Sequence, residues 1–210
     1  MKLLVMCSSY NYPEGLIEMY NSFLETKSEE TEIKIYVSED DPRIEDYKKL
    51  DIPIEFGEHK YMVGVMNYFS SKYDAEAYQL ICDDHIYLKK GWDVLILEKI
   101  KEVGYVSFFD KDDYSNKNPT ADVLRFDIVR KLGYFIYPKF RQAYLEPFMQ
   151  HLARKVGNIN LGSDYIEHKC WHGLSKSPKN LRHDFIYGED ENFSINLMAE
   201  AIGDVNEKFR

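Results

Sequence analysis

Two carboxylates and an imidazole stand together directly after a short apolar run. The run is Tyr78 to Cys82, and residues 83–85 read Asp-Asp-His. A buried strand of an open α/β sheet delivers the residues that follow it to the carboxyl edge, where such sheets bind ligands. Adjacent carboxylates repel each other unless a positive charge lies beside them, and a divalent cation that carries phosphates supplies one. A solvated acidic turn is the alternative interpretation, and spacing alone leaves both open.

Polar turns also follow the first two expected strands. An apolar strand at residues 2–7 runs into a polar turn at residues 8–11, and Pro13 behind it is suited to the first turn of a helix. A second strand at residues 31–37 ends in the acidic turn 38–41. Because parallel strands end at the same edge of a sheet, we expect both turns to lie beside residues 83–85.

Strand and helix patterns alternate along the chain. Strands are expected at residues 2–7, 31–37, 52–56, 78–82, 105–109, 159–161 and 165–167. Helices are expected after Pro13, at 63–73, after Asp93 and through Val103, and at 126–132, 145–156 and 190–202. Gly104 is expected to end the helix before it as a C′ residue. This rhythm predicts an α/β fold with a mainly parallel sheet and helices on both faces.

Composition sets limits on the class of protein. A chain of 210 residues that is 44% hydrophobic can bury one substantial core, which favours a single domain. The net charge of −9 argues against a nucleic-acid partner. Cys7, Cys82 and Cys170 are an odd number without paired spacing, so we expect no disulfide framework and a reducing, cytoplasmic setting. The first apolar run is too short for a signal peptide or a membrane span.

The order of these features resembles the GT-A glycosyltransferases, and more closely the small glycosyltransferase-family-2-like proteins of phage and bacterial genomes. The resemblance covers nearly the whole chain and rests on Ser8-Ser9, Asp40-Asp41-Pro42, Asp83-Asp84-His85 with Gly91-Trp92-Asp93, Glu167-His168, Asn67, and Asp184 with Tyr187. It implies a Rossmann-like, GT-A-like single domain, in which residues 1–110 form the nucleotide-binding half and residues 111–210 the acceptor-side half.

The resemblance implies a metal-dependent, inverting transferase of the hexosyltransferase type. Such an enzyme moves a sugar from a nucleotide-sugar donor, here expected to be UDP-linked, to a hydroxyl of a sugar or other acceptor. An Asp-x-Asp-like element holds Mn²⁺ or Mg²⁺ in this family. The implied metal ligands are Asp84, His85 and His168. The implied nucleotide contacts are Ser8, Ser9, Tyr10, Asn11, Glu39, Asp40, Asp41, Asn67 and Asp83.

Two positions depart from the family pattern. His85 stands where a second acid is usual, which leaves open which two of Asp83, Asp84 and His85 bind the metal. Ser38 stands where an aspartate is usual, which leaves recognition of the nucleotide base to the acids that follow it.

Glu146, at a helix start, is the implied general base that takes the proton of the acceptor hydroxyl, and the acids of residues 110–113 are the next candidates. In the alternative interpretation Glu146 has no catalytic role and is a first-turn acid that the helix dipole stabilises.

Three alternatives remain. Cys170 lies between His168 and His172, and these residues with His183 could form a zinc site, although no second paired spacing supports one. A sugar nucleotidyltransferase would need a glycine-rich phosphate loop with a basic residue, and residues 8–11 have neither. A non-catalytic nucleotide- or carbohydrate-binding module of the same fold differs from a transferase in releasing no free nucleoside diphosphate.

Overall fold

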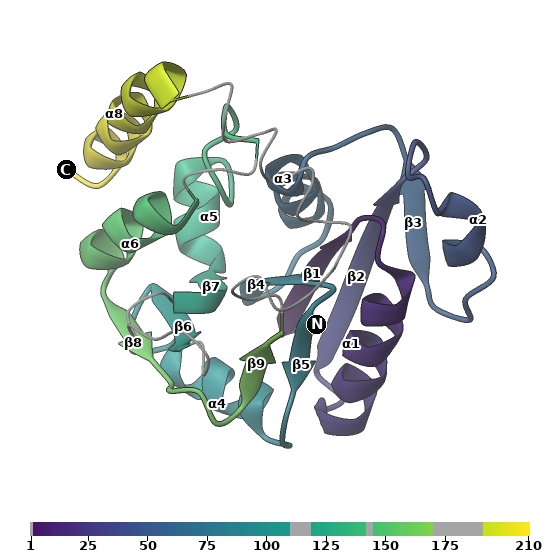
Figure 1. The fold of residues 1–210 in the computed structure, drawn as a ribbon. Helices are drawn as coiled ribbons and strands as arrows, with labels where there is room; N and C mark the ends of the chain where they lie inside the picture. Colours follow the sequence, from purple (N-terminus) through teal and green to yellow (C-terminus); the bar gives the residue numbers. More distant parts are fainter. Residues whose placement is uncertain (1, 110–118, 142–144, 170–190) are drawn as a thin grey trace.

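The computed structural model describes residues 2–109, 119–141, 145–169 and 191–210. A seven-stranded sheet forms its centre, with strand order β3-β2-β1-β4-β7-β6-β8 (Figure 1). The strands are β1 Leu3–Ser9, β2 Thr31–Ser38, β3 Ile54–Gly57, β4 Ala77–Cys82, β6 Tyr105–Phe109, β7 Pro119–Arg125 and β8 Asn158–Asn160. Strands β1 to β4 are mutually parallel, β7 is antiparallel to both β4 and β6, and β8 is parallel to β6. The expected mainly parallel α/β sheet is confirmed.

Helices cover both faces of the sheet, as expected. On one face lie α1 Pro13–Thr26, α2 Ile44–Tyr47 and α4 Trp92–Lys99; on the other lie α3 Met62–Lys72, α5 Phe126–Leu132, α6 Leu145–Val156 and α8 Glu191–Lys208. The side chains of β1 divide between the two faces, with Leu4 and Met6 in one apolar cluster and Leu3 and Val5 in the other. Burial on both faces explains why this strand reads as an unbroken apolar run.

A small second sheet brings the carboxyl-terminal third of the chain to the end of β4. Strand β5 His85–Tyr87 pairs antiparallel with β9 Ile166–His168, and His85 lies opposite His168 (Figure 1). Tyr87 and Ile166 are both buried in the apolar cluster that α1 covers. The core therefore anchors this two-stranded sheet, and the polar residues of β5 and β9 are held at the edge of the main sheet.

Residues 91–93 of the Gly-Trp-Asp sequence have structural roles. Gly91 has a φ of 90°, a conformation that glycine adopts without strain. Trp92 is fully buried and stacks on Tyr87, with 4.2 Å between ring centroids. Asp93 is also buried, and its Oδ2 accepts a hydrogen bond of 2.7 Å from the hydroxyl of Thr31. This motif fastens the start of α4 to the start of β2.

The structure also corrects the sequence analysis. The strand β7 was not expected, and neither were the short elements α2 and β5. Gly104 is not a C′ residue, because α4 ends at Lys99 and Gly104 does not have a positive φ. A Cβ on Gly104 would lie 2.7 Å from Cβ of Val156, so the glycine permits a close approach of α6 to β6. The acids of 110–113 lie outside the described residues, as do Cys170, His172, His183, Asp184 and Tyr187.

Candidate active site

Asp84, His85 and His168 converge at the carboxyl end of β4. Oδ1 of Asp84 lies 3.3 Å from Nε2 of His168 and 3.4 Å from Nδ1 of His85. The two imidazole rings stack with 4.3 Å between their centroids. The backbone N–H of Lys169 donates to the carbonyl of Asp84, 2.8 Å away, which fixes the end of β9 against this turn. The structure thus brings together the three side chains that the sequence analysis assigned to a metal.

The donor set fits a divalent cation. Asp84 is only 6% exposed, so its carboxylate faces the two rings rather than bulk water. A ligand atom of Cys82, at the end of β4, also lies within 4.8 Å of ligand atoms of Asp84 and His85. Carboxylate oxygen with imidazole nitrogen suits Mn²⁺, whereas the sulfur of Cys82, which binds metals as the deprotonated thiolate, would favour softer ions.

The ring of His85 is engaged through both nitrogens. Nδ1 accepts a hydrogen bond of 3.1 Å from the backbone N–H of Cys82, so in the neutral ring the proton is on Nε2. Nε2 lies 2.8 Å from the hydroxyl of Thr120 at the start of β7. Strand β7 therefore orients this imidazole, and Asp84 and His168 are the side chains better placed to bind an ion without rearrangement.

Asp83 turns away from Asp84 and holds the end of β1 together with the polar turn after it. Its Oδ2 accepts hydrogen bonds from the hydroxyl of Ser9, at 2.6 Å, and from the N–H of Tyr10, at 3.2 Å. Because the Ser9 proton is used there, the hydroxyl of Tyr47 donates to Ser9 Oγ at 2.7 Å and accepts from the N–H of Tyr12. Burial raises the pKa of Tyr47, which keeps this donor protonated. The turn is thus preorganised by buried side chains.

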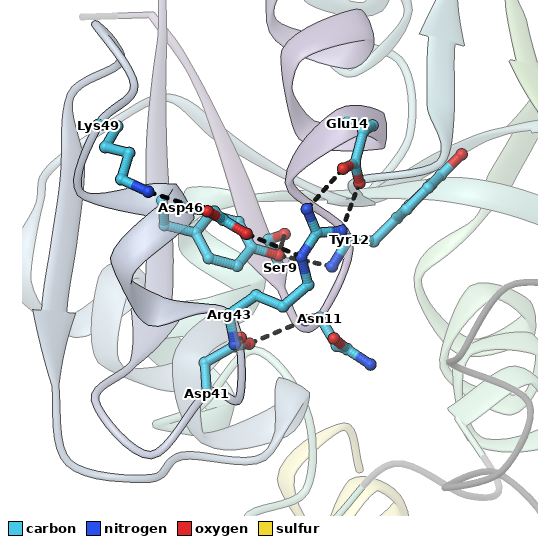
Figure 2. Close-up of polar contacts among 9 residues, drawn as sticks. Ser9, Asn11, Tyr12, Glu14, Asp41, Arg43, Asp46 and Lys49 are labelled. Atoms are coloured by element: carbon cyan, nitrogen blue, oxygen red, sulfur yellow. Dashed lines mark hydrogen bonds and ion pairs between the residues drawn. The ribbon is translucent and has the colours of Figure 1, made fainter.

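Asp41 braces the same turn from the end of β2, as Figure 2 shows. Its Oδ2 accepts a hydrogen bond of 2.8 Å from the N–H of Asn11, a residue with a positive φ of 53°. Its Oδ1 accepts from the N–H of Arg43, whose guanidinium makes a two-pronged contact with Glu14 in α1 (Figure 2). The turns after β1, β2 and β4 are consequently one connected unit, as the sequence predicted.

The other expected nucleotide contacts occupy varied surroundings. Ser8 is half-buried, while Glu39 and Asp40 are exposed, and Asp40 lies 3.1 Å from Nδ1 of His59. Asn67 is occupied by the backbone: its Oδ1 accepts from the N–H groups of residues 135 and 136, and its Nδ2 donates to the carbonyl of Ile136. These hydrogen bonds tie α3 to the segment before α6. They give the Asn67 side chain a structural role that does not require a ligand.

Glu146 lies in the first turn of α6, at the helix start that the sequence predicted, and its side chain is exposed. A titratable residue that was not foreseen from the sequence, Asp122 of β7, is only 8% exposed. The hydroxyl of Tyr105 donates a hydrogen bond to Oδ1 of Asp122. Burial raises the pKa of Asp122 to about 7, and the Glu146 carboxylate adds to this effect. The signal for β7 was the apolar pair before Arg125, but the polar run ahead of it concealed the strand.

Comparison of the sequence with protein-family models and with curated proteins finds no match. Solved structures do match. The mannosyltransferase PcManGT from Pyrobaculum calidifontis, in complex with GDP-Man and Mn²⁺, has a TM-score of 0.66 at 12% identity, covering 99% of this chain and 73% of its own. S. aureus TarS 1-349 in complex with UDP has a TM-score of 0.61 at 12% identity, covering 80% and 60%.

The chain has the GT-A fold. A third match, TarS 1-349 in complex with UDP-GlcNAc, has a TM-score of 0.60 at 15% identity, covering 82% of this chain. This chain spans 60% of the length of the TarS 1-349 chain in both complexes. At these identities the likeness establishes the GT-A architecture of nucleotide-sugar glycosyltransferases, and the site residues must be argued from this chain. Among the described helices, none combines the length and apolar character needed to cross a bilayer.

Proposed function

We propose that this GT-A protein is a metal-dependent, inverting glycosyltransferase that uses a UDP-linked sugar donor and an acceptor hydroxyl. The observation that carries the proposal is the convergence of Asp84, His85 and His168 at the carboxyl end of β4. This is the edge where open α/β sheets bind ligands. The TarS complexes with UDP and UDP-GlcNAc support a uridine donor, and the Mn²⁺ in the PcManGT complex supports a metal.

In this proposal Asp84 and His168 hold Mn²⁺ or Mg²⁺, with His85 as a third ligand or as the ring that orients His168. A bound cation supplies positive charge that offsets the negative charge of the departing diphosphate. The turn at residues 8–11, braced by Asp83 and Asp41, lines the base and ribose, with Glu39 and Asp40 beside it. Backbone and hydroxyl groups that are already fixed bind a ligand with little further loss of entropy.

Glu146 is the proposed general base. It takes the proton from the acceptor hydroxyl as the acceptor oxygen forms a bond to the anomeric carbon. The bond from that carbon to the diphosphate oxygen breaks on the opposite face of the sugar, and UDP leaves with the electron pair. The first turn of α6 fixes the backbone of Glu146, and its exposed carboxylate is open to an acceptor, which suits this role.

Isothermal titration calorimetry with UDP and Mn²⁺ tests the proposal. Asp84→Asn keeps the shape of the side chain but removes the charge that offsets the cation, so we expect Mn²⁺-dependent UDP affinity to fall by roughly tenfold or more. Asp51→Asn, at an exposed aspartate, is the matched control and should leave the affinity unchanged. Equal affinity of the wild type for UDP in Mn²⁺ and in excess chelator would contradict the metal assignment, and stronger binding of GDP would contradict the uridine donor.

A further inference from the structure

Strand β7 has a bulge where it passes the candidate site. Thr120 of β7 pairs with Phe108 of β6. The next pair along is Val123 with Val106, so β7 has one residue more than β6 between the two pairs. Ala121, inside the bulge, has a positive φ of 52°, a conformation that is strained for a residue with a Cβ. Backbone strain of this kind is often retained where it helps to shape a functional site.

The extra residue determines the face of the sheet to which Thr120 belongs. On a regular strand, residues three apart point to opposite faces. Residues that pair directly share a face, and both β6 partners belong to the apolar cluster that α1 covers. Thr120 and Val123 therefore lie on the same face, which is also the face of Tyr87 in β5. The bulge thus turns Thr120 toward the two-stranded sheet of β5 and β9.

The hydroxyl of Thr120 engages one nitrogen of His85, because it lies 2.8 Å from Nε2. Nδ1 accepts the hydrogen bond from the N–H of Cys82, so a neutral ring carries its proton on Nε2 and donates it to the hydroxyl. The ring is 2% exposed and presents its face to His168, with 4.3 Å between centroids and 15° between planes. Thr120 therefore determines both the tautomer and the orientation of His85.

A fully buried amide ties the bulge to β5. Gln79 of β4 donates from Nε2 to the carbonyl of Ala121 at 3.4 Å, and its Oε1 accepts from the hydroxyl of Tyr87 at 3.2 Å. Burying an amide is unfavourable unless its polar atoms are hydrogen-bonded, so this arrangement resists displacement of either strand. The position of Thr120 relative to His85 is therefore held by a second set of hydrogen bonds.

We propose that Thr120 is a positioning residue of the candidate metal site. It holds His85 as a fixed platform on which His168 stacks, so that His168 and Asp84 bind the ion and His85 does not. Nε2 of His168 lies 3.3 Å from Oδ1 of Asp84, and the backbone of β9 is paired with β5 at this point. The proposal rests on the proposed function and deepens it, because it gives His85 the orienting role rather than that of a third ligand.

Removing the Thr120 hydroxyl tests its effect on metal binding. Thr120→Val keeps the shape of the side chain, and isothermal titration calorimetry should show Mn²⁺ affinity lowered about tenfold or more, while Thr120→Ser restores the hydroxyl and the affinity. Thr26→Val is the matched control, because the hydroxyl of Thr26, at the carboxyl end of α1, also accepts a ring N–H, from Nε1 of Trp92 at 3.1 Å. Unchanged or stronger Mn²⁺ binding by Thr120→Val would show that Nε2 of His85 is released to the ion, and would overturn the proposal.

Electron spin-echo spectroscopy counts the imidazole nitrogens bound to Mn²⁺ and does not need turnover. His85→Phe keeps an aromatic ring for the stack on His168, so its count should equal that of the wild type. His168→Phe should lower the count by one. A count that falls in His85→Phe makes His85 a ligand and overturns the proposal.

Nitrogen NMR of the metal-free protein reports the tautomer of the ring directly. His85 should carry its proton on Nε2 in the wild type and in Thr120→Ser, and this N–H signal should broaden or disappear in Thr120→Val. A proton on Nδ1 in the wild type, or a signal that ignores Thr120→Val, overturns the proposal. A wild type that binds no Mn²⁺, or that binds it and transfers no sugar, overturns the proposed function instead, and the tautomer then decides whether Thr120 positions His85.

Discussion

Around the parallel strands, Asp41, Asp83 and Asp93 are all buried, and each accepts at least two hydrogen bonds from N–H or O–H groups. In the antiparallel part of the sheet, Asp122 is buried to a similar degree. Within the part of the chain that the structure describes, its one hydrogen bond comes from Tyr105. The two regions therefore bury the same chemical group in very different surroundings.

The surroundings of these carboxylates determine what each of them does. Several hydrogen-bond donors stabilise the charged form of a carboxylate. Such a carboxylate holds the backbone segments that donate to it in place. Burial with a single donor and the charge of Glu146 nearby disfavours the charged form, so Asp122 is left able to titrate near neutrality. The turns after the parallel strands are held by several hydrogen bonds to buried aspartates, whereas β7 carries a carboxyl group whose raised pKa makes it respond to pH.

The largest expected loss of stability comes from removing one of these buried, multiply hydrogen-bonded aspartates. Asp93→Ala would leave the N–H of Ser28, the hydroxyl of Thr31 and the N–H of Val94 without their acceptor, at distances of 2.6, 2.7 and 2.9 Å in the wild type. The Thr31 hydroxyl is buried and the two N–H groups are part-buried. Donors left unsatisfied in such surroundings cost about 1–3 kcal/mol each, and together with the loss of the buried side chain the free energy of unfolding should fall by roughly 5 kcal/mol. Urea unfolding measures this. Glu98→Ala, at an exposed ion pair of the same helix, is the control and should cost under about 1 kcal/mol.

The second expected effect concerns Asp122, whose removal should stabilise the protein rather than destabilise it, by an amount that depends on pH. The pKa of Asp122 is raised from 3.8 to about 7, so between these values the unfolded chain releases a proton that the folded protein keeps. The stability that this group contributes is complete below pH 3.8 and is lost as the pH rises to about 7, a difference of about 4 kcal/mol. Urea unfolding from pH 4 to pH 8 should show the wild type losing this amount relative to Asp122→Asn.

Other carboxylates have a lowered pKa and make stability rise with pH, which is why the comparison with Asp122→Asn matters. Glu55 is one example, with a pKa lowered by hydrogen bonds from Lys72, Tyr73 and Tyr68 against the effect of burial. Both variants share these groups, so they cancel in the difference. Parallel stability curves for wild type and Asp122→Asn between pH 4 and pH 8 would show that Asp122 titrates normally and would remove the contrast between the two regions.

The sequence predicted those parts of the molecule that local pattern controls. Pro13 begins α1, Gly133 follows α5 with a φ of 82°, and α6 spans the expected residues 145–156. The apolar runs of β1 and β4 read clearly because both faces of these strands are buried. Only the family resemblance, and no local pattern, could place His168 beside Asp84.

Long-range packing determined the features that sequence reasoning missed. Strand β7 follows a polar run and has a bulge, so its alternation is broken at Ala121 and Asp122. Gly104 was expected to end a helix, but a glycine is needed there because Val156, which is distant in sequence, lies too close for a Cβ. Asn67 and Asp83 were expected to contact the nucleotide, which stays a prediction. The hydrogen bonds that occupy their side chains in this structure could not be read from neighbouring residues.

The smallest effect tests whether the two regions differ only in their carboxylates. Gly91 of the parallel region and Gly133 after α5 both have positive φ, with open space where a Cβ would lie. Alanine at either position is strained by the left-handed conformation alone, so each variant should lose about 1 kcal/mol in urea unfolding. Gly203→Ala is the matched control. It also adds a Cβ in open space, but inside helix α8, where alanine should gain about 1 kcal/mol. A cost at Gly91 several-fold larger than at Gly133 would mean that the parallel region is rigid through its backbone as well as its buried aspartates.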